Sequence, residues 1–402
     1  MIDQTILFLT HSDFCDDIYT PYSKELGLVL NFDNDMHFGQ PLKKIFSNVI
    51  RFDISVAYCQ FGVIRTNQMI IDLVRQHNPK YVFWPTMTYE VFEETFQKIR
   101  KSGVFVIGWF FDDETRFDNY SRWWIPYLDY IFTADKMSVS KYQQFGAKAY
   151  HLLVTGEAED YKSQISETSY EVSFVGSKYV ADRDSLVNRF YNDGVSISTF
   201  GNGWPNGFVS HDEMVQIFGN SKINICFTKS NIDQRNQLKG KIFDITLSGG
   251  FLLCEYVDGI EAIFELGIEI VCFNNYADAI KKIDYFLRNN DERKKIAIAG
   301  KKKSIRNLTQ HKLLENAFLS IEADIIKTKR NIIIQTVSKQ MPIHIRRVHA
   351  DYHYKRANVL KKYKFYKKIW IDEYYIAFKY SAFIFLKRVI RRCLVYFFIL
   401  KR

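Results

Sequence analysis

One segment in the second half of the chain combines residues suited to binding a nucleotide. In QLKGKIFDITLSGG (237–250), Lys239 and Lys241 stand near the N-terminal end of an expected helix. Free backbone N–H groups and the helix dipole favour a phosphate at such an end. Asp244 follows one turn after Lys241, where a carboxylate can hold a ribose diol. The spacing fits a nucleotide diphosphate, although Lys and Asp three positions apart also form ordinary ion pairs on solvated helices.

Glycine-containing turns follow two further expected strands of the same region. Gly176 and Ser177 end the apolar run EVSFVGS, where a backbone can approach a pyrophosphate closely and a hydroxyl can donate to it. The turn Gly201–Trp204 (GNGW) follows SISTFG. Its tryptophan can line a base or a sugar, or can serve only as a packing cap. The pair Gly249 and Gly250 ends the lysine-bearing helix before the buried strand FLLCEY.

Three residues of the first half are candidates for a catalytic base. Asp112 and Asp113 follow the expected strand VFVIGWFF, and Glu114 adds a third carboxylate. Crowded carboxylates raise one another's pKa, which suits proton pickup from a hydroxyl, although the same residues are also favoured in a first helical turn. His11 follows the first strand and can act as a base or remain a hydrogen-bonded surface residue.

No metal site is predicted. The D-D-E run lacks the D-x-D spacing of a metal-binding motif, and no cluster of His and Cys offers tetrahedral ligands.

The elements that must position these residues alternate along the chain. The chain has 402 residues, 47% of them hydrophobic, which favours two or three globular domains. Short apolar runs alternate with amphipathic segments, the pattern of parallel α/β sheets, and many runs end in polar residues. The polar interval Glu157–Tyr170 is a plausible hinge. We therefore expect an α/β fold with two doubly wound, Rossmann-like domains, at residues 1–160 and 165–330.

The second half also resembles a known family. It contains a K-x-F-D helix, a G-G turn, the segment GIEAIFELGIE and the segment ERKKIAIAG, preceded by SFVGS, GNGW and NSKIN. Over residues 171–311 this combination is similar to bacterial group 1 glycosyltransferases, especially their spore-maturation-protein-like branch. The resemblance implies the GT-B fold, two Rossmann-like domains facing a central cleft, with the nucleotide-sugar in the C-terminal domain. The donor residues it favours are Gly176, Ser177, Gly201, Gly203, Trp204, Lys239, Lys241, Asp244, Gly249 and Gly250.

Three positions depart from the family pattern. Asp244 replaces the usual Glu, and Lys241 stands where Arg is common and loses its bidentate fork. Asn236 occupies the position of a second Glu found in retaining relatives, so a retaining mechanism loses its support.

The function expected from the resemblance is metal-independent transfer of a sugar, without a cofactor, to a hydroxyl of a cell-surface glycan or glycolipid. Asp112, Asp113 or His11 would take the proton. The departures leave a second hypothesis open, a non-catalytic scaffold or partner-binding protein with the nucleotide-sugar fold.

The last segment, 341–402, differs in composition from the rest. It carries 16 Lys and Arg against 3 Asp and Glu, so the overall net charge of +10 is concentrated there. In 383–398 apolar residues recur at helical spacing opposite a basic stripe, which favours an anionic membrane surface. A crossover helix packed on the first domain and a partner interface are the alternatives. RNA binding lacks an accompanying motif, so no nucleic-acid partner is expected.

Cysteine usage and the N-terminal residues favour the cytoplasm. The six cysteines form no C-x-x-C pair, three of them lie in apolar strand-like runs, and the opening MIDQTILFLT predicts a strand rather than a signal peptide. With the basic tail, we expect a cytoplasmic protein at the inner face of the membrane.

Overall fold

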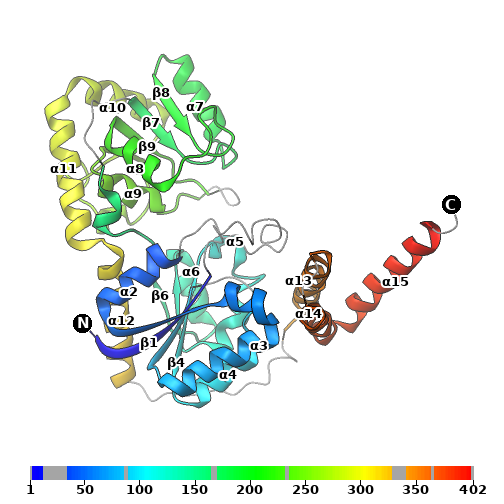
Figure 1. Ribbon diagram of the computed structural model, residues 1–402. Coiled ribbons are helices and arrows are strands. Elements are labelled where there is room, and N and C mark those ends of the chain that lie inside the picture. Colours follow the sequence, from blue (N-terminus) through cyan, green and yellow to red (C-terminus); the bar gives the residue numbers. More distant parts are fainter. Residues whose placement is uncertain are drawn as a thin grey trace. The chain divides into compact units, whose positions relative to one another are not determined.

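The structure is a computed structural model that describes residues 2–11, 34–85, 89–163, 170–230, 235–327, 341–363 and 366–399, with side chains as far as 390. The chain divides into two compact units (Figure 1). The first comprises residues 1–151 and 319–402, and the second comprises 152–318.

The first unit is built on a parallel sheet, in which the described residues form six strands. These strands are β1 (Ile2–Thr10), β2 (Phe46–Asp53), β3 (Tyr81–Trp84), β4 (Phe105–Phe110), β5 (Tyr130–Thr133) and β6 (Ala149–His151). Their order is β2-β1-β3-β4-β5-β6, and all the pairings are parallel. The helical segments between them are η1 (Asp35–Gly39), α2 (Gln40–Ile45), α3 (Ile54–His77), α4 (Glu93–Lys101), α5 (Asp113–Arg116), η2 (Ser121–Tyr127) and α6 (Lys136–Gln144).

Both faces of this sheet are buried, as the continuous apolar run of β1 requires. Leu7 and Leu9 point to one face and join a core with α3 and α4. Phe8 points to the other face and stacks on Phe83, which in turn meets Phe38 of η1 edge-on. Because side chains of a strand alternate, one apolar run supplies both cores.

The second unit repeats the pattern with a parallel sheet, for which the described residues supply five strands. These are β7 (Tyr170–Val175), β8 (Ile197–Phe200), β9 (Ser221–Cys226), β10 (Leu252–Glu255) and β11 (Val271–Phe273), in the order β11-β10-β9-β7-β8. Its helical segments are η3 (Ala158–Tyr161), α7 (Arg183–Asn192), α8 (His211–Gly219), α9 (Gly240–Ser248), η4 (Ile260–Ala262), α10 (Tyr276–Arg288), α11 (Asn290–Asn307) and the first half of α12 (Gln310–Lys327). The prediction of two doubly wound α/β units is therefore confirmed.

The strand orders locate where each sheet changes direction. In the first unit the chain moves from β1 to β2 on one side and continues at β3 on the other, so the switch point lies between β1 and β3. In the second unit the same reversal lies between β7 and β9. Ligands of open α/β sheets bind beyond the carboxyl ends of the strands at such points.

The described residues of the C-terminal segment form three helices, and they differ from the separate tail that the sequence predicted. They are α13 (Ile343–Lys362), α14 (Lys367–Tyr380) and α15 (Ala382–Ile399). Leu360, Ile369 and Ile376 are buried against Tyr58 and Val63 of α3, so α13 and α14 belong to the first unit. This agrees with the alternative of a helix packed on the first domain, for residues 343–380.

The packing of α14 explains a kink in α3. Gly62 has a φ of +78°, and a Cβ there would lie 3.3 Å from the side chain of Ile369. Glycine therefore gives both the turn in the helix and the room for α14.

The second unit also ends earlier in the chain than the predicted boundary at residue 330. The chain returns to the first unit within α12, at residue 319. Glu322 and Asp324 hold it there through ion pairs with Lys80 (2.6 Å) and Lys148 (2.5 Å). None of the helices in the described parts of the chain is long and apolar enough to cross a membrane.

Candidate functional site

Two glycine turns lie against each other at the carboxyl ends of the neighbouring strands β7 and β8 in the second unit. The N–H of Gly176, directly after β7, donates to the carbonyl of Phe200 at 2.9 Å. Gly201 has a φ of +112°, and a Cβ on it would lie 2.5 Å from the carbonyl oxygen of Gly176. Only glycine fits this approach, so the turn 201–204 lies directly against the end of β7.

Trp204 acts as a packing cap in this turn. Its indole Nε1 donates to the carbonyl of Gly176 at 2.9 Å, and its ring is 7% exposed and packs edge-on against Phe174. The side chain therefore fixes the two turns to each other. This packing favours the role of a cap over that of lining a base or a sugar. Gly203, with a φ of +87°, leaves room for the ring of Tyr179, and the hydroxyl of Ser177 accepts from the Tyr179 N–H at 3.3 Å.

Lys241 and Asp244 lie together on the first turns of α9. Lys241 Nζ is 3.3 Å from Asp244 Oδ2 and 2.7 Å from the Met214 sulfur, with about a third of the lysine side chain exposed. Oδ1 of Asp244 accepts from the hydroxyl of Tyr161 at 2.6 Å, and burial, together with this carboxylate, raises the pKa of that phenol. Lys239 is the N-cap residue of α9, and it makes no side-chain cap to the helix.

Gly249 and Gly250 are not part of this group. Gly249, with a φ of +82°, is the C-cap of α9, and Gly250 lies against the Phe218 carbonyl and the Asn224 side chain. At about 1.5 Å per residue, a nine-residue helix separates them from Lys241 by more than 10 Å. The prediction that they bind the donor is corrected: they end the helix and let it pack closely on the sheet.

Residues that the sequence reading did not select complete this edge. Thr228, two residues beyond β9, donates through its backbone N–H to Glu255 Oε2 at 2.9 Å and through its hydroxyl at 3.3 Å. Lys229 pairs with Asp182 at 2.9 Å, and this hydrogen bond raises the pKa of Lys229. Arg183 donates to the Ser177 carbonyl at 3.2 Å, and burial lowers its pKa. The sequence held a signal for Thr228 and Lys229, because these two polar residues directly follow the apolar run INICF and so mark the end of the strand beside β7.

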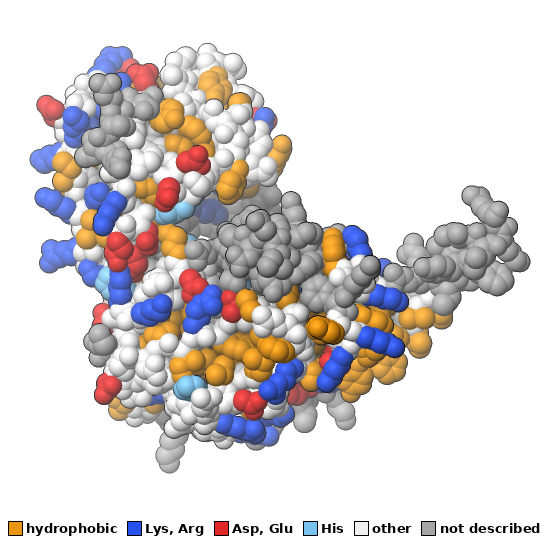
Figure 2. All heavy atoms as spheres, viewed as in Figure 1, with side chains coloured by type: hydrophobic (Ala, Val, Ile, Leu, Met, Phe, Trp, Pro, Cys, Tyr) orange, Lys and Arg blue, Asp and Glu red, His pale blue; other side chains and the backbone are white. Residues whose placement is uncertain are grey.

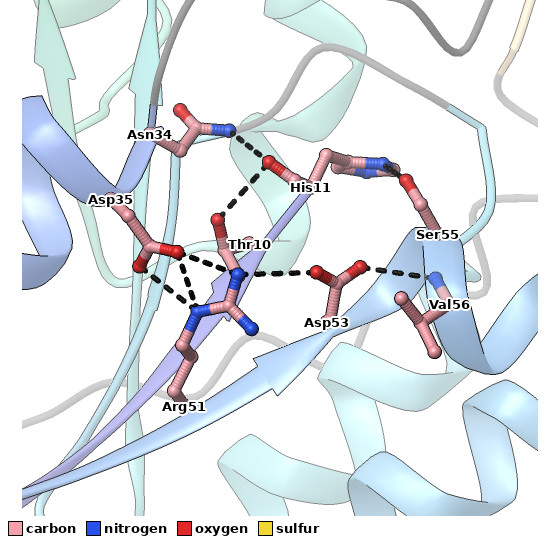
Figure 3. Close-up of polar contacts among 8 residues, drawn as sticks. All are labelled: Thr10, His11, Asn34, Asp35, Arg51, Asp53, Ser55 and Val56. Carbon is pink, nitrogen blue, oxygen red and sulfur yellow. Dashed lines mark hydrogen bonds and ion pairs between the residues drawn. The ribbon is translucent and has the colours of Figure 1, made fainter. Parts of the chain in front are cut away.

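His11 lies at the switch point of the first unit, directly after β1 (Figure 3). It is 2% exposed, its Nδ1 makes a short contact with the hydroxyl of Ser55, and its Nε2 is 3.9 Å from Oε2 of Glu90. Burial lowers the pKa of His11 and outweighs the opposite effects of Glu90 and Asp53. His11 is therefore a neutral imidazole inside the unit, and an acceptor hydroxyl would reach it only if the Ser55 contact opened.

A charged network lies beside His11 on the same edge (Figure 3). Arg51 donates from Nε to both carboxylate oxygens of Asp35, at 2.9 and 2.7 Å, and from a terminal nitrogen to Asp53 at 3.2 Å. The other oxygen of Asp53 accepts the Val56 N–H at 3.0 Å and caps α3. This network fixes the start of α3, and with it the position of Ser55.

The two aspartates after β4 differ completely in environment. Asp113 is fully buried and accepts from the hydroxyls of Thr133 (2.7 Å) and Tyr142 (2.8 Å), and burial raises its pKa to about 6. The prediction of Asp113 as a base is therefore corrected, because its carboxylate is buried and accepts hydrogen bonds from interior hydroxyls. Asp112 is exposed and has a φ of +56°, an uncommon conformation for a residue other than glycine. It remains the accessible candidate.

Asp112 and His11 do not form one cluster. β3 lies between β1 and β4, so at about 4.8 Å per strand their strand ends are roughly 10 Å apart. No group of three or more His, Cys, Asp or Glu side chains within the described ranges is arranged to hold a metal ion.

Comparison with known proteins agrees with this architecture. Residues 181–317 match the family described as glycosyl transferase-like. The structure of HepE from Anabaena in complex with UDP-glucose aligns with a TM-score of 0.52, at 11% identity over 80% of this chain and 100% of HepE. The chain has the GT-B fold. HepE in complex with UDP and glucose gives a TM-score of 0.51 at the same identity and coverage.

A glycosyltransferase from Rickettsia africae aligns at 13% identity over 82% of this chain and 100% of its own, with a TM-score of 0.48. None of the curated proteins matches this sequence significantly. The residues that match the glycosyl transferase-like family lie in the second unit. The glycine turns and Lys241 lie in the same unit.

Proposed function

We propose that this GT-B chain is a glycosyltransferase that uses a nucleoside-diphosphate sugar. The observation that carries the proposal is the coincidence of two features in the second unit. The match to the glycosyl transferase-like family covers residues 181–317, and in the same unit Gly201 lies against Gly176 at the end of β7, a strand that borders the switch point. HepE, with the same fold, binds UDP-glucose, so a uridine nucleotide is the first donor to test.

In the proposed reaction an acceptor hydroxyl attacks the anomeric carbon of the donor sugar. The bond from that carbon to the phosphate oxygen breaks, and the nucleoside diphosphate leaves. Lys241 and the N-terminal end of α9 would stabilise the negative charge that develops on the leaving group. Asp112 is the exposed carboxylate that would take the acceptor proton. The proposed acceptor is a hydroxyl of a cell-surface glycan or glycolipid, and no metal is required.

The proposed location is the inner face of the membrane. The described side chains of α14 and α15 leave large apolar groups exposed, including Tyr375 (60%), Phe383 (61%) and Leu386 (51%). Figure 2 shows hydrophobic and basic side chains next to each other over these helices. An apolar face with adjacent cations suits an anionic lipid surface.

Thermal shift and product formation test the proposal in two steps. UDP and UDP-sugars should raise the Tm of the purified full-length chain, because a ligand of the native state stabilises it. Transfer should then release UDP faster in the presence of a lipid-linked glycan extract. If no nucleotide shifts the Tm, the donor assignment is wrong.

Binding without turnover would favour the second candidate, a scaffold that keeps the nucleotide-sugar fold. The contact between Lys241 and Asp244 supports this second candidate, because each of the two residues proposed to bind the donor already has the other as a partner.

A further inference from the structure

A buried arginine from the C-terminal segment reaches the switch point of the first unit. Arg356 of α13 is 2% exposed, and its guanidinium forms an ion pair with Oε1 of Glu90, which is fully buried. The guanidinium lies between two phenol rings, 4.3 Å from the ring centre of Tyr352 and 4.8 Å from that of Tyr58. A buried charge is costly without its partner, so Arg356 and Glu90 depend on each other.

Glu90 is fixed from several sides. It follows β3, and so it belongs to the switch point that His11 approaches from β1. Its backbone carbonyl accepts from Asn67 Nδ2 at 2.6 Å, and its Oε1 also accepts from the Tyr352 hydroxyl at 3.1 Å. Its Oε2 is the oxygen 3.9 Å from His11 Nε2. Arg356 thus contacts one oxygen of the carboxylate, and His11 faces the other.

Three charged groups and one hydroxyl surround His11, and they come from four parts of the unit. Glu90 faces it from the segment after β3, Asp53 from the end of β2 and Arg356 from α13, while Ser55 of α3 contacts Nδ1. The 3.9 Å between Glu90 Oε2 and His11 Nε2 is longer than a hydrogen bond, and the negative charge of the carboxylate favours the tautomer that turns an N–H of Nε2 toward it. Nδ1 then keeps its lone pair and accepts from the hydroxyl of Ser55.

We propose that Arg356 is a positioning residue of the acceptor site, which holds the Glu90 carboxylate against the imidazole of His11. The inference rests on the proposed function in one respect, that the acceptor binds at this edge of the first unit. It makes α13 an integral part of that site rather than part of a detachable tail. Arg356 acts through Glu90, and it fixes which nitrogen of His11 carries the proton.

A double-mutant cycle tests this relationship on the full-length chain. The variants are Arg356→Met, Glu90→Gln and the combination of both. Lys355→Met is the matched control, because Lys355 is its exposed neighbour on α13. We expect Arg356→Met to lower the rate of transfer about tenfold or more and to leave UDP binding unchanged. The double variant should transfer no more slowly than Glu90→Gln alone, because without the Glu90 carboxylate Arg356 no longer holds a group against His11.

An NMR titration of His11 supplies a readout that does not need activity. The His11 signal is assigned by its loss in His11→Gln. Arg356 lowers the pKa of His11, so Arg356→Met should move the titration upward, while Lys355→Met should not. An unmoved titration together with an unchanged rate in folded Arg356→Met would overturn the proposal, as would losses that multiply in the double variant.

Two further outcomes are separable. If Arg356→Met alone does not fold, the double variant removes both buried charges, and its rate of transfer is compared with that of Glu90→Gln. A double variant that is slower than Glu90→Gln contradicts the inference. If the wild type shows no transfer at all, the proposed function fails, and the titration still decides the positioning role.

Discussion

The hydroxyl of Tyr161 donates a 2.6 Å hydrogen bond to Oδ1 of Asp244, and the other oxygen of that carboxylate is 3.3 Å from Nζ of Lys241. Asp244 therefore connects η3, which precedes the second sheet, to the lysine at the start of α9. From the sequence, Asp244 was expected to hold a ribose. Its contacts give it a second role, since it orients the lysine proposed to face the diphosphate.

Replacing Lys241 with alanine should weaken binding of UDP and UDP-sugars. A hydrogen bond to a charged group is worth about 1.5–3 kcal/mol, which corresponds to a loss of roughly 10- to 100-fold in affinity. Isothermal titration calorimetry on the folded variant measures this loss. Lys222→Ala is the matched control, because Lys222 is a partly exposed lysine at the start of β9 that pairs with Glu171. Equal affinities for Lys241→Ala and the control would remove Lys241 from the donor site.

Tyr161→Phe should have a smaller effect on the same affinity. The substitution removes one hydrogen bond of Asp244 and leaves the contact with Lys241 in place. We expect the loss in affinity to be about three- to tenfold, in line with about 1 kcal/mol for one hydrogen bond. The same titration with the Tyr161→Phe variant measures it. A loss as large as that of Lys241→Ala would mean that Tyr161 itself contacts the nucleotide.

The sequence predicted the fold well because each strand is a short apolar run with a polar end. It also selected the turns at Gly176 and Gly201 as separate candidates, and the structure places Gly201, with a positive φ, against Gly176. The local sequence pattern could not tell which of Asp112 and Asp113 is buried. The burial of Asp113 depends on Thr133 and Tyr142, which belong to elements that follow β4 in the chain. Nor could the local pattern show that Arg356 pairs with Glu90, because that contact joins positions 266 residues apart through tertiary packing alone.

The raised pKa of Asp113 predicts a specific pH dependence of stability. Its pKa is about 6 in the folded unit and 3.8 in the unperturbed state, so the folded chain binds more protons between these values. Its contribution to stability is therefore complete below pH 3.8 and is lost as the pH rises through about 6. Between pH 5 and 8 the free energy of unfolding of the wild type should fall by about 1–2 kcal/mol relative to Asp113→Asn.

Urea denaturation of the two proteins at both pH values measures this difference. Asp118→Asn is the control, since Asp118 is exposed. A difference between wild type and Asp113→Asn that does not change with pH would mean that the Asp113 carboxyl group does not titrate in this window.

Transfer activity should survive removal of divalent cations. In the proposed mechanism, the charge of the leaving diphosphate is met by Lys241 and the N-terminal end of α9. The rate of UDP release should therefore be the same in EDTA and in added Mg²⁺ or Mn²⁺. A strict need for either ion would contradict the metal-independent mechanism and would direct attention to Asp112 as a ligand.

Two truncations should separate the roles of the C-terminal helices. Ending the chain at Ser381 removes α15 and leaves α13 and α14 in place. This variant should fold and bind UDP, but it should bind vesicles of phosphatidylglycerol and phosphatidylcholine more weakly than the full chain. Ending the chain at residue 340 removes Arg356 together with α13 and α14, so Glu90 loses its cation and Tyr58 and Val63 lose the helices packed on them. We expect that variant to be destabilised by about 3–5 kcal/mol, as a broken buried ion pair is.

Point variants on α15 test the membrane contact without truncation. Leu386 and Ile390 lie four positions apart on α15 and are 51% and 57% exposed. Because burying such a side chain in an apolar environment is worth about 1.5–3 kcal/mol, Leu386→Ser with Ile390→Ser should weaken vesicle binding at least about tenfold in co-sedimentation. Leu319→Ser is the control, since Leu319 of α12 is equally exposed, at 52%. Binding that falls with salt but is indifferent to the serine pair would mean that the cations alone hold the protein, and that the apolar face of α15 contacts another protein instead.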